Sequence, residues 1–199
     1  MSFVDVFGLP EEEPEERQTW VSPPWFGPPD SEVGVVVALN LVLARSDAAV
    51  VVLPFATAYS TGIGFELHAQ ARGLEPRDTQ RLFHEQHLPP GTEPSDALLR
   101  VGVQLPSGER VSNLGGRRPW HDVETPPPGS VLMQHGGGGG TSGNDAVLMR
   151  PGFWLWPLPD TGTLRLSCEW PIVGIPLTTV ELDTAPLLEA SQNANYLWP

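Results

Sequence analysis

The sequence predicts an all-β fold: a single antiparallel β-sandwich, immunoglobulin-like in the loose sense, with a short C-terminal helix and an extended N-terminal arm. Side chains in several segments alternate between apolar and polar with a period of two, as in strands that bury one face. Proline and glycine supply 23 and 21 of the 199 residues, which indicates many turns. Helical stretches are too few and too short to cover a parallel sheet, and no repeat of fixed period indicates a propeller or a solenoid.

Two parts are expected, an acidic and proline-rich arm over residues 1–32 and the sandwich domain over residues 33–199. Residues 1–33 hold eight acidic residues and one basic residue, and so contribute −7 to a formal net charge of −13. Such a segment either binds a basic partner or is a solvated leader. Its aromatic residues, Trp20, Trp25 and Phe26, are expected to pack on the domain or on a partner, because disordered tails are usually poor in aromatics.

The first three strands are expected in residues 32–72. Glu32–Ala44 is almost continuously apolar, which predicts a strand buried on both faces or an edge strand covered by the arm. Ala48–Tyr59 contains Pro54, which cannot donate a ladder hydrogen bond and therefore predicts an edge position or a bulge. Ile63–Arg72 alternates most clearly and predicts an antiparallel partner of the preceding strand, with one face in the core.

The second half of the chain continues with short strands and irregular connections. The long connection 73–97 is expected to hold one or two helical turns between Asp78 and His87. The five glycines at 136–140 predict a mobile loop, because no side chain can pack there. The remaining strands are expected in segments 98–105, 110–114, 131–135, 146–150, 153–158, 163–170 and 177–182.

The last strands also make predictions about single residues. In Thr163–Trp170, alternation places Cys168 on the apolar face, so we expect it in the core. Asp183 is expected to be the N-cap of the C-terminal helix, with Pro186 in its first turn.

Charge and cysteine content exclude several classes of partner. All eleven basic residues are arginine, and no basic patch is visible, so nucleic acids and anionic membrane surfaces are not expected as partners. No apolar run reaches the ~18 residues that would cross a bilayer. The single cysteine rules out an intrachain disulfide, and the N-terminus lacks the pattern of a signal peptide, so a cytoplasmic location is expected.

Histidines and one aspartate are the candidate metal ligands. His84 and His87 stand three residues apart in FHEQH, and on a helix they would share a face that His68, His121 or Asp122 could complete across the sheet. Zinc needs three or four ligands, and the HExxH pattern is absent. The other interpretation is polar residues on a surface turn. No cofactor is expected and no catalytic residue is assigned, because neither a nucleophile elbow nor a phosphate-binding glycine motif is present.

Tryptophans supply the candidate contact residues. Trp154 and Trp156 fall on one face of their strand and form either an exposed platform or part of the core. With Trp20, Trp25 and Phe26 they suggest a non-catalytic, cytoplasmic interaction module that binds a protein partner or associates with itself. Two alternatives remain open: a small-molecule-binding or glycan-binding protein, which includes the case of a metal-dependent hydrolase, and an acidic protein of the immunity or antitoxin type.

Several motifs recur in a recognisable order: AYSTGIGFELHAQAR at 58–72, the glycine run followed by WLWPLP at 136–159, and a CEWP stretch within the segment around 163–190. In this order they resemble a family of uncharacterised all-β proteins from high-GC Gram-positive bacteria. The resemblance covers most of residues 33–198 but not the arm. GIGF at 62–65 departs from it by two inserted residues. It implies the fold class and the location, and no known activity.

Overall fold

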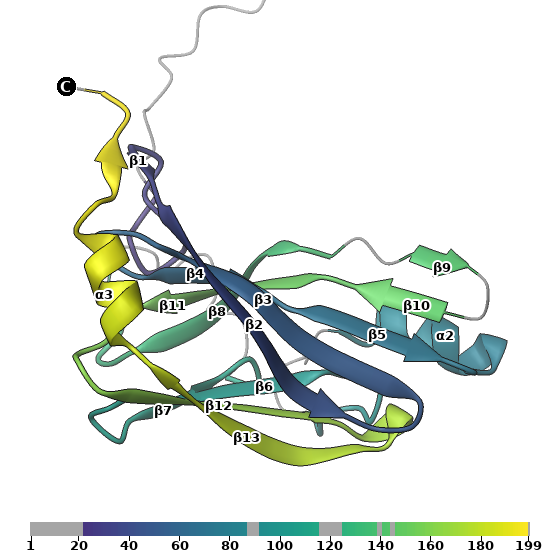
Figure 1. Cartoon of the computed structure of the whole chain (residues 1–199). Helices are drawn as coiled ribbons and strands as arrows, with labels where there is room; N and C mark the ends of the chain where they lie inside the picture. The colour runs from purple at the N-terminus through teal and green to yellow at the C-terminus, as the bar shows by residue number, and fades with distance from the viewer. Residues whose placement is uncertain (1–21, 87–91, 116–124, 139–140, 144–145, 199) are drawn as a thin grey trace, which may run out of the picture.

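The computed structural model describes residues 22–86, 92–115, 125–138, 141–143 and 146–198 (Figure 1). Antiparallel strands in two main sheets dominate this part of the chain, and its helical elements are short. The predicted all-β class is therefore confirmed. The immunoglobulin-like arrangement stays a prediction.

The larger sheet has eight strands. Its order is β8 (Val131–Gly137), β11 (Pro151–Trp156), β4 (Ile63–Glu66), β3 (Ala49–Ala58), β5 (His68–Arg72), β10 (Ala146–Met149) and β9 (Thr141–Gly143), with β2 (Val35–Arg45) on the other side of β3. β4 and β5 lie along successive halves of β3, so this long strand is the spine of the sheet.

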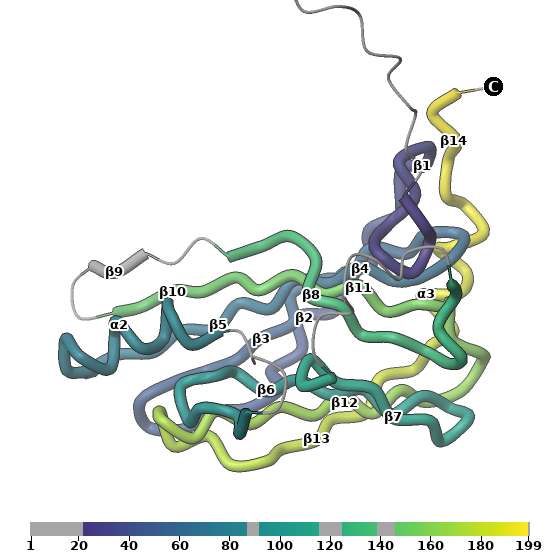
Figure 2. The backbone as a smooth tube through the Cα atoms, turned by 180° about the vertical axis from the view of Figure 1, so that it is seen from behind, coloured from purple at the N-terminus to yellow at the C-terminus, as the bar shows by residue number. Residues whose placement is uncertain are grey.

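The smaller sheet has four strands. A separate two-stranded ribbon pairs a strand near the start of the described chain with the last strand. The order of the smaller sheet is β13 (Ile175–Asp183), β12 (Thr163–Trp170), β6 (Arg100–Gln104) and β7 (Arg110–Ser112). The ribbon pairs β1 (Glu32–Val33) with β14 (Asn195–Tyr196), and Figure 2 shows it at one end of the molecule. The helical elements are α2 (Pro76–His84), the 3₁₀ turn η2 (Pro171–Val173) and α3 (Ala185–Ser191).

The core lies between the inner faces of the two main sheets. Ile63, Phe65 and Leu67 are buried, as their alternation predicts, and Phe65 stacks on Phe153 of the neighbouring β11. The smaller sheet contributes Leu164, Leu166 and the predicted core residue Cys168. Side chains of both sheets enclose a space of only about 10 Å³, which is barely room for one water.

The pairing of β2 and β3 tests two predictions from the sequence: the edge position or bulge at Pro54, and the position of β2 in the sheet. The register of β3 shifts by one residue between Val52↔His68 and Ala56↔Phe65, and Pro54 sits in this irregular stretch. The bulge predicted from Pro54 is therefore confirmed. Among the described strands β2 pairs only with β3 and is an edge strand, helix α3 packs on it, and Val36 on its outer face is exposed.

The connection after β5 contains the expected helical turns. Helix α2 is held by Arg81, whose guanidinium bonds Glu85 at 3.1 Å and also contacts Asp96. These bonds, with that of Ser95 to Glu85, lower the pKa of both carboxyls. The cluster ties α2 to the segment that leads into β6.

Two further local expectations are corrected. Gly136 and Gly137 belong to β8, and the Gly138 amide donates to the Arg150 carbonyl at 2.8 Å, so this part of the glycine run is held against β11. Helix α3 has Thr184, not Asp183, at its N-cap position, although the Asp183 carboxylate accepts the Ala185 amide at 3.0 Å. Among the described residues, no helix combines the length and apolar character needed to cross a membrane.

Candidate functional site

The first candidate site is the set of aromatics that the sequence singled out, and it lies on the outer face of the larger sheet. Phe153 and Leu155 point from β11 into the core, so the alternate residues Trp154 and Trp156 point the opposite way. Residues 22–31 run over this face. We call Trp25, Tyr59, Trp154 and Trp156 the aromatic cluster.

The contacts of the aromatic cluster join the N-terminal segment to the sheet. The Trp154 indole N–H donates to the Pro24 carbonyl at 2.9 Å. The ring of Trp25 meets that of Trp156 edge-on at 5.8 Å, and Tyr59 meets Trp154 in the same way at 5.6 Å. The segment is therefore fastened by one hydrogen bond and by ring packing.

This packing decides between the two interpretations of the tryptophans. Trp154 is 0% exposed, Trp25 and Phe26 are buried, and Trp156 is half-buried; Trp20 lies outside the described residues. Packing on the chain's own domain is thus what the structure shows for Trp25, Phe26 and Trp154. The prediction that these three residues contact a partner is therefore corrected, because their rings are already covered by other parts of the same chain.

The histidine candidates do not form a site in the part of the chain that is described. His84 lies exposed at the end of α2, whereas His87, His121 and Asp122 fall outside the described residues. His68 contacts Glu66 at 3.2 Å on the outer face of the sheet. Within the described ranges, no group of three or more His, Cys, Asp or Glu side chains is placed to hold a metal ion.

A second candidate site, which the sequence did not single out, is the ribbon at the chain ends. Exposed large apolar side chains lie on the ribbon or next to it: Tyr196 is 70% exposed, Trp198 is 74% exposed, and Leu197, Val33 and Val36 at the start of β2 are also exposed. We call these five residues the terminal patch. The yellow C-terminal strand runs beside the purple N-terminal segment in both Figures 1 and 2.

The terminal patch is positioned by a buried carboxylate. Glu32 of β1 is buried and accepts a hydrogen bond from the Ser60 amide at 3.0 Å and another from the Ser60 hydroxyl. Its negative charge adds to the effect of burial in raising the pKa of Tyr59. On the opposite strand the Leu197 amide donates to the Ser31 carbonyl at 2.8 Å. The ribbon that carries the exposed aromatic side chains is therefore held to the rest of the domain by hydrogen bonds of Glu32, and its two strands are held together by backbone hydrogen bonds.

The single cysteine is a structural residue. Cys168 is 1% exposed, and burial raises the pKa of its thiol to about 11. A reactive cysteine needs a lowered pKa and an accessible sulfur, so this thiol is not suited to nucleophilic work.

This raised pKa predicts a pH dependence of stability. The folded thiol keeps its proton above the ordinary value, so its contribution is fully present below pH ~9 and is lost as pH rises towards about 11. Urea unfolding from pH 8 to 11 should show a loss of about 2–3 kcal/mol in the wild type relative to Cys168→Ala. Parallel pH profiles of the two proteins would contradict the assignment.

Comparisons with models of protein families, with curated proteins and with solved structures found no match to this chain. The resemblance to a family from high-GC Gram-positive bacteria therefore stays a prediction.

Proposed function

We propose that this protein is a cytoplasmic, non-catalytic module that binds another protein through the terminal patch. The observation that carries the proposal is the gathering of exposed apolar side chains: of eight large ones in the described part of the chain, five belong to this patch. Contiguous exposed apolar surface marks contact sites, and Trp and Tyr are the residues that most often anchor them. The single cysteine, free and buried, fits a reducing compartment.

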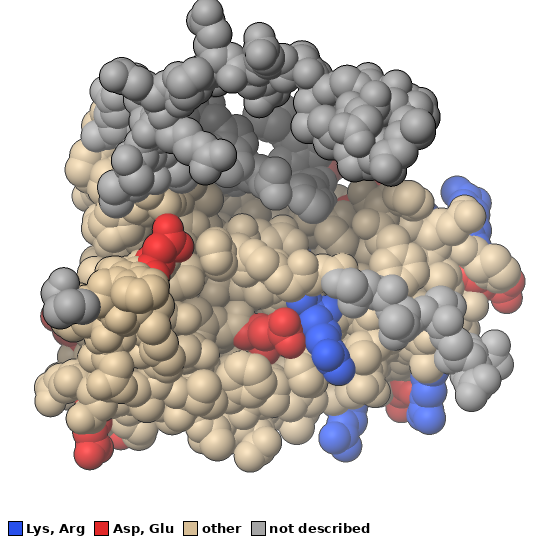
Figure 3. Space-filling model, turned by 90° about the horizontal axis from the view of Figure 1, so that it is seen from above, with Lys and Arg blue, Asp and Glu red and all other residues tan. Residues whose placement is uncertain are grey.

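Charge favours a partner with a basic surface. Glu11, Glu12, Glu13, Glu15 and Glu16 precede Ser22 in the sequence, and Glu16 is six residues from it. Residues 22–31 lead directly into β1, the strand of the terminal patch. The described surface seen from above in Figure 3 carries few charged side chains. The proposed contact region therefore combines the apolar patch with the acidic segment that precedes it in sequence. Negative charge raises the association rate with a basic protein.

The alternative of an immunity or antitoxin type of protein would use the same electrostatic attraction, since it also requires a basic partner. The net charge of −13 supports it, and no further residue distinguishes it from other protein binding. The small-molecule alternative rests on the loops 73–97 and 115–129, which carry His84, His87, His121 and Asp122; of these four residues, only His84 lies in the described part of the chain.

Photo-crosslinking tests the terminal patch. Benzoylphenylalanine replaces Trp198 in one full-length chain and Leu177 in another, because Leu177 is equally exposed but lies on β13 of the smaller sheet. We expect an adduct with a distinct protein from position 198 and not from position 177. Adducts that are the same from both positions would contradict the proposal, and an adduct with a second copy of this chain would replace the basic partner by self-association.

Binding of the purified partner then gives the size of the effect. The double variant Tyr196→Ser, Trp198→Ser should weaken binding by ~100-fold, since it removes two aromatic anchors, while Leu177→Ser leaves it unchanged. Affinity should fall as salt is raised from about 0.05 to 0.3 M. Equal binding by the double variant and the wild type would refute the assignment of the patch.

A further inference from the structure

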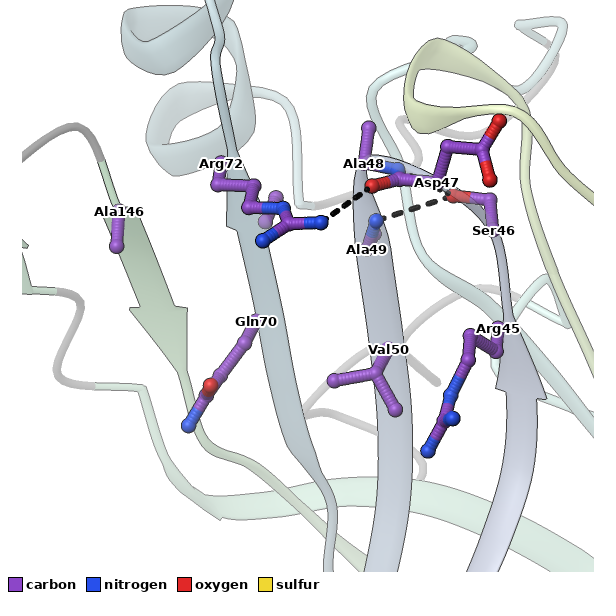
Figure 4. A pocket seen from close by; sticks show the side chains of 10 residues that line it. Arg45, Ser46, Asp47, Ala48, Ala49, Val50, Gln70, Arg72 and Ala146 are labelled. Atoms are coloured by element: carbon purple, nitrogen blue, oxygen red, sulfur yellow. Dashed lines mark hydrogen bonds between the residues drawn. The ribbon is translucent and has the colours of Figure 1, made fainter.

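A hollow of about 360 Å³ lies at the β2–β3 hairpin, at the far end of β2 from the terminal patch (Figure 4). Nine residue steps of β2 lie between Val36 of the patch and Arg45 of the hollow, so the two places are separated by roughly 30 Å of strand. The hollow is open to solvent and is lined by strands β2, β3, β5 and β10 and by the hairpin turn.

Strand register explains which side chains surround the hollow. Arg45 is opposite Val50, and Val50 is opposite Gln70, so these three form one row across the outer face of the sheet. Arg72, two residues beyond Gln70, is opposite Ala146. Two guanidinium groups therefore flank small apolar side chains, while the Gln70 amide points away from Val50 in Figure 4.

The hydrogen bonds of the hairpin leave most of these donors free. Arg72 donates one bond to the Asp47 carbonyl at 3.2 Å, which leaves its other N–H groups available. Neither Arg45 nor Gln70 makes a side-chain hydrogen bond or an ion pair with any described residue, unlike Arg81, Arg100 and Arg165.

The neighbouring polar groups do not oppose an anion in the hollow. Ser46 is occupied, since its hydroxyl donates to the Val173 carbonyl and accepts the Ala49 amide. The Asp47 carboxylate points away from Arg72 in Figure 4. The described side chains that line the hollow thus include two arginines and one carboxylate, in a chain whose net charge is −13.

We propose that the hollow binds a short aliphatic dicarboxylate. One carboxylate pairs with Arg45, the other pairs with Arg72, and the methylene chain lies over Val50 and Ala48. Guanidinium groups bind carboxylates through paired, charge-assisted hydrogen bonds. The two arginines come from strands on either side of β3, so a two-ended ligand fits them better than a single small anion.

Titration of the full-length chain with adipate tests this site, followed by NMR at ~0.15 M salt so that the distant negative charge is screened. We expect saturable shifts with a Kd of about 1 mM or tighter. Hexanoate, with one carboxylate, and inorganic phosphate should each bind at least ~10-fold more weakly. No saturation by ~20 mM adipate, or tighter binding of phosphate than of adipate, would overturn the proposal.

Variants assign the shifts to the hollow. Arg45→Gln and Arg72→Gln should each weaken adipate binding by about tenfold or more, as expected for loss of a charge-assisted pair. Arg110→Gln is the matched control, because Arg110 is exposed, makes no ion pair within the described residues and lies on β7 of the smaller sheet. An equal loss in Arg110→Gln would show a general charge effect and refute the site.

Discussion

Replacement of Trp154 by alanine is expected to lower the free energy of unfolding by about 3–5 kcal/mol. The side chain is fully buried, so the change leaves a large cavity between β11 and the segment that covers it. It also removes the hydrogen bond to the Pro24 carbonyl and the edge-on contact with Tyr59. Equilibrium unfolding in urea measures this loss.

The same substitution should release the N-terminal segment. Trp25 and Phe26 are buried only while residues 22–31 lie on the sheet, so hydrogen exchange of these amides should quicken in Trp154→Ala. Trp154→Phe keeps a ring and loses the N–H, and should cost about 1–2 kcal/mol. The control is Trp156→Ala, at a half-buried position two residues along the same strand, for which a smaller loss is expected. Unchanged hydrogen exchange of residues 22–31 in Trp154→Ala would show that Trp154 does not fasten the segment.

The sequence predicts which side chains of a strand face the core wherever one face of the strand is buried and the other is exposed to solvent. Ile63–Arg72 and Thr163–Trp170 alternate because each lies in an antiparallel sheet with its apolar side against the other sheet. β2 was harder to interpret, since valine occupies both of its faces. Valine suits an extended backbone whether or not it is buried, so its outer face is apolar and yet exposed at Val36 and Val42.

The candidate sites depend on contacts that alternation does not report. Sequence spacing puts Trp154 and Trp156 on one face but says nothing of what covers it, and residues 22–31 cover it from more than 120 positions away in the chain. Residues 196–198 of the terminal patch follow helix α3 and show no alternation of apolar and polar residues that predicts a strand. Their attachment becomes visible only in the pairing of β14 with β1 and in the bond from the Leu197 amide to the Ser31 carbonyl.

The hollow at the hairpin depends on two bulges. The register of β2 against β3 runs from Val35↔Ala58 to Arg45↔Val50, a slip of two residues along the pair. Without that slip Arg45 would face Ala48 and would not share a row with Gln70. Asn40 adopts a positive φ of 49° at the first irregularity, and Asn is a residue type that tolerates this conformation, but its presence alone does not predict a bulge.

Substitution of Gly137 by alanine should be as damaging as loss of Trp154, for a different reason. Gly137 has a φ of +70°, and a Cβ there would lie 2.1 Å from the Arg150 carbonyl oxygen and 2.3 Å from the Gly152 nitrogen. Backbone strain and a clash with backbone atoms act together, so we expect a loss of about 3–5 kcal/mol in urea unfolding.

Gly136 is the matched control for this clash. Its φ of +66° is nearly the same, but a Cβ there meets nothing within 4 Å, so Gly136→Ala carries only the conformational cost of about 1–2 kcal/mol. The difference between the two variants measures the approach of β8 to β11 at Pro151↔Gly137, where the register shifts. Equal losses would mean that β8 can move away at no cost, and hence that the close approach does not hold the strand carrying Trp154 and Trp156 in place.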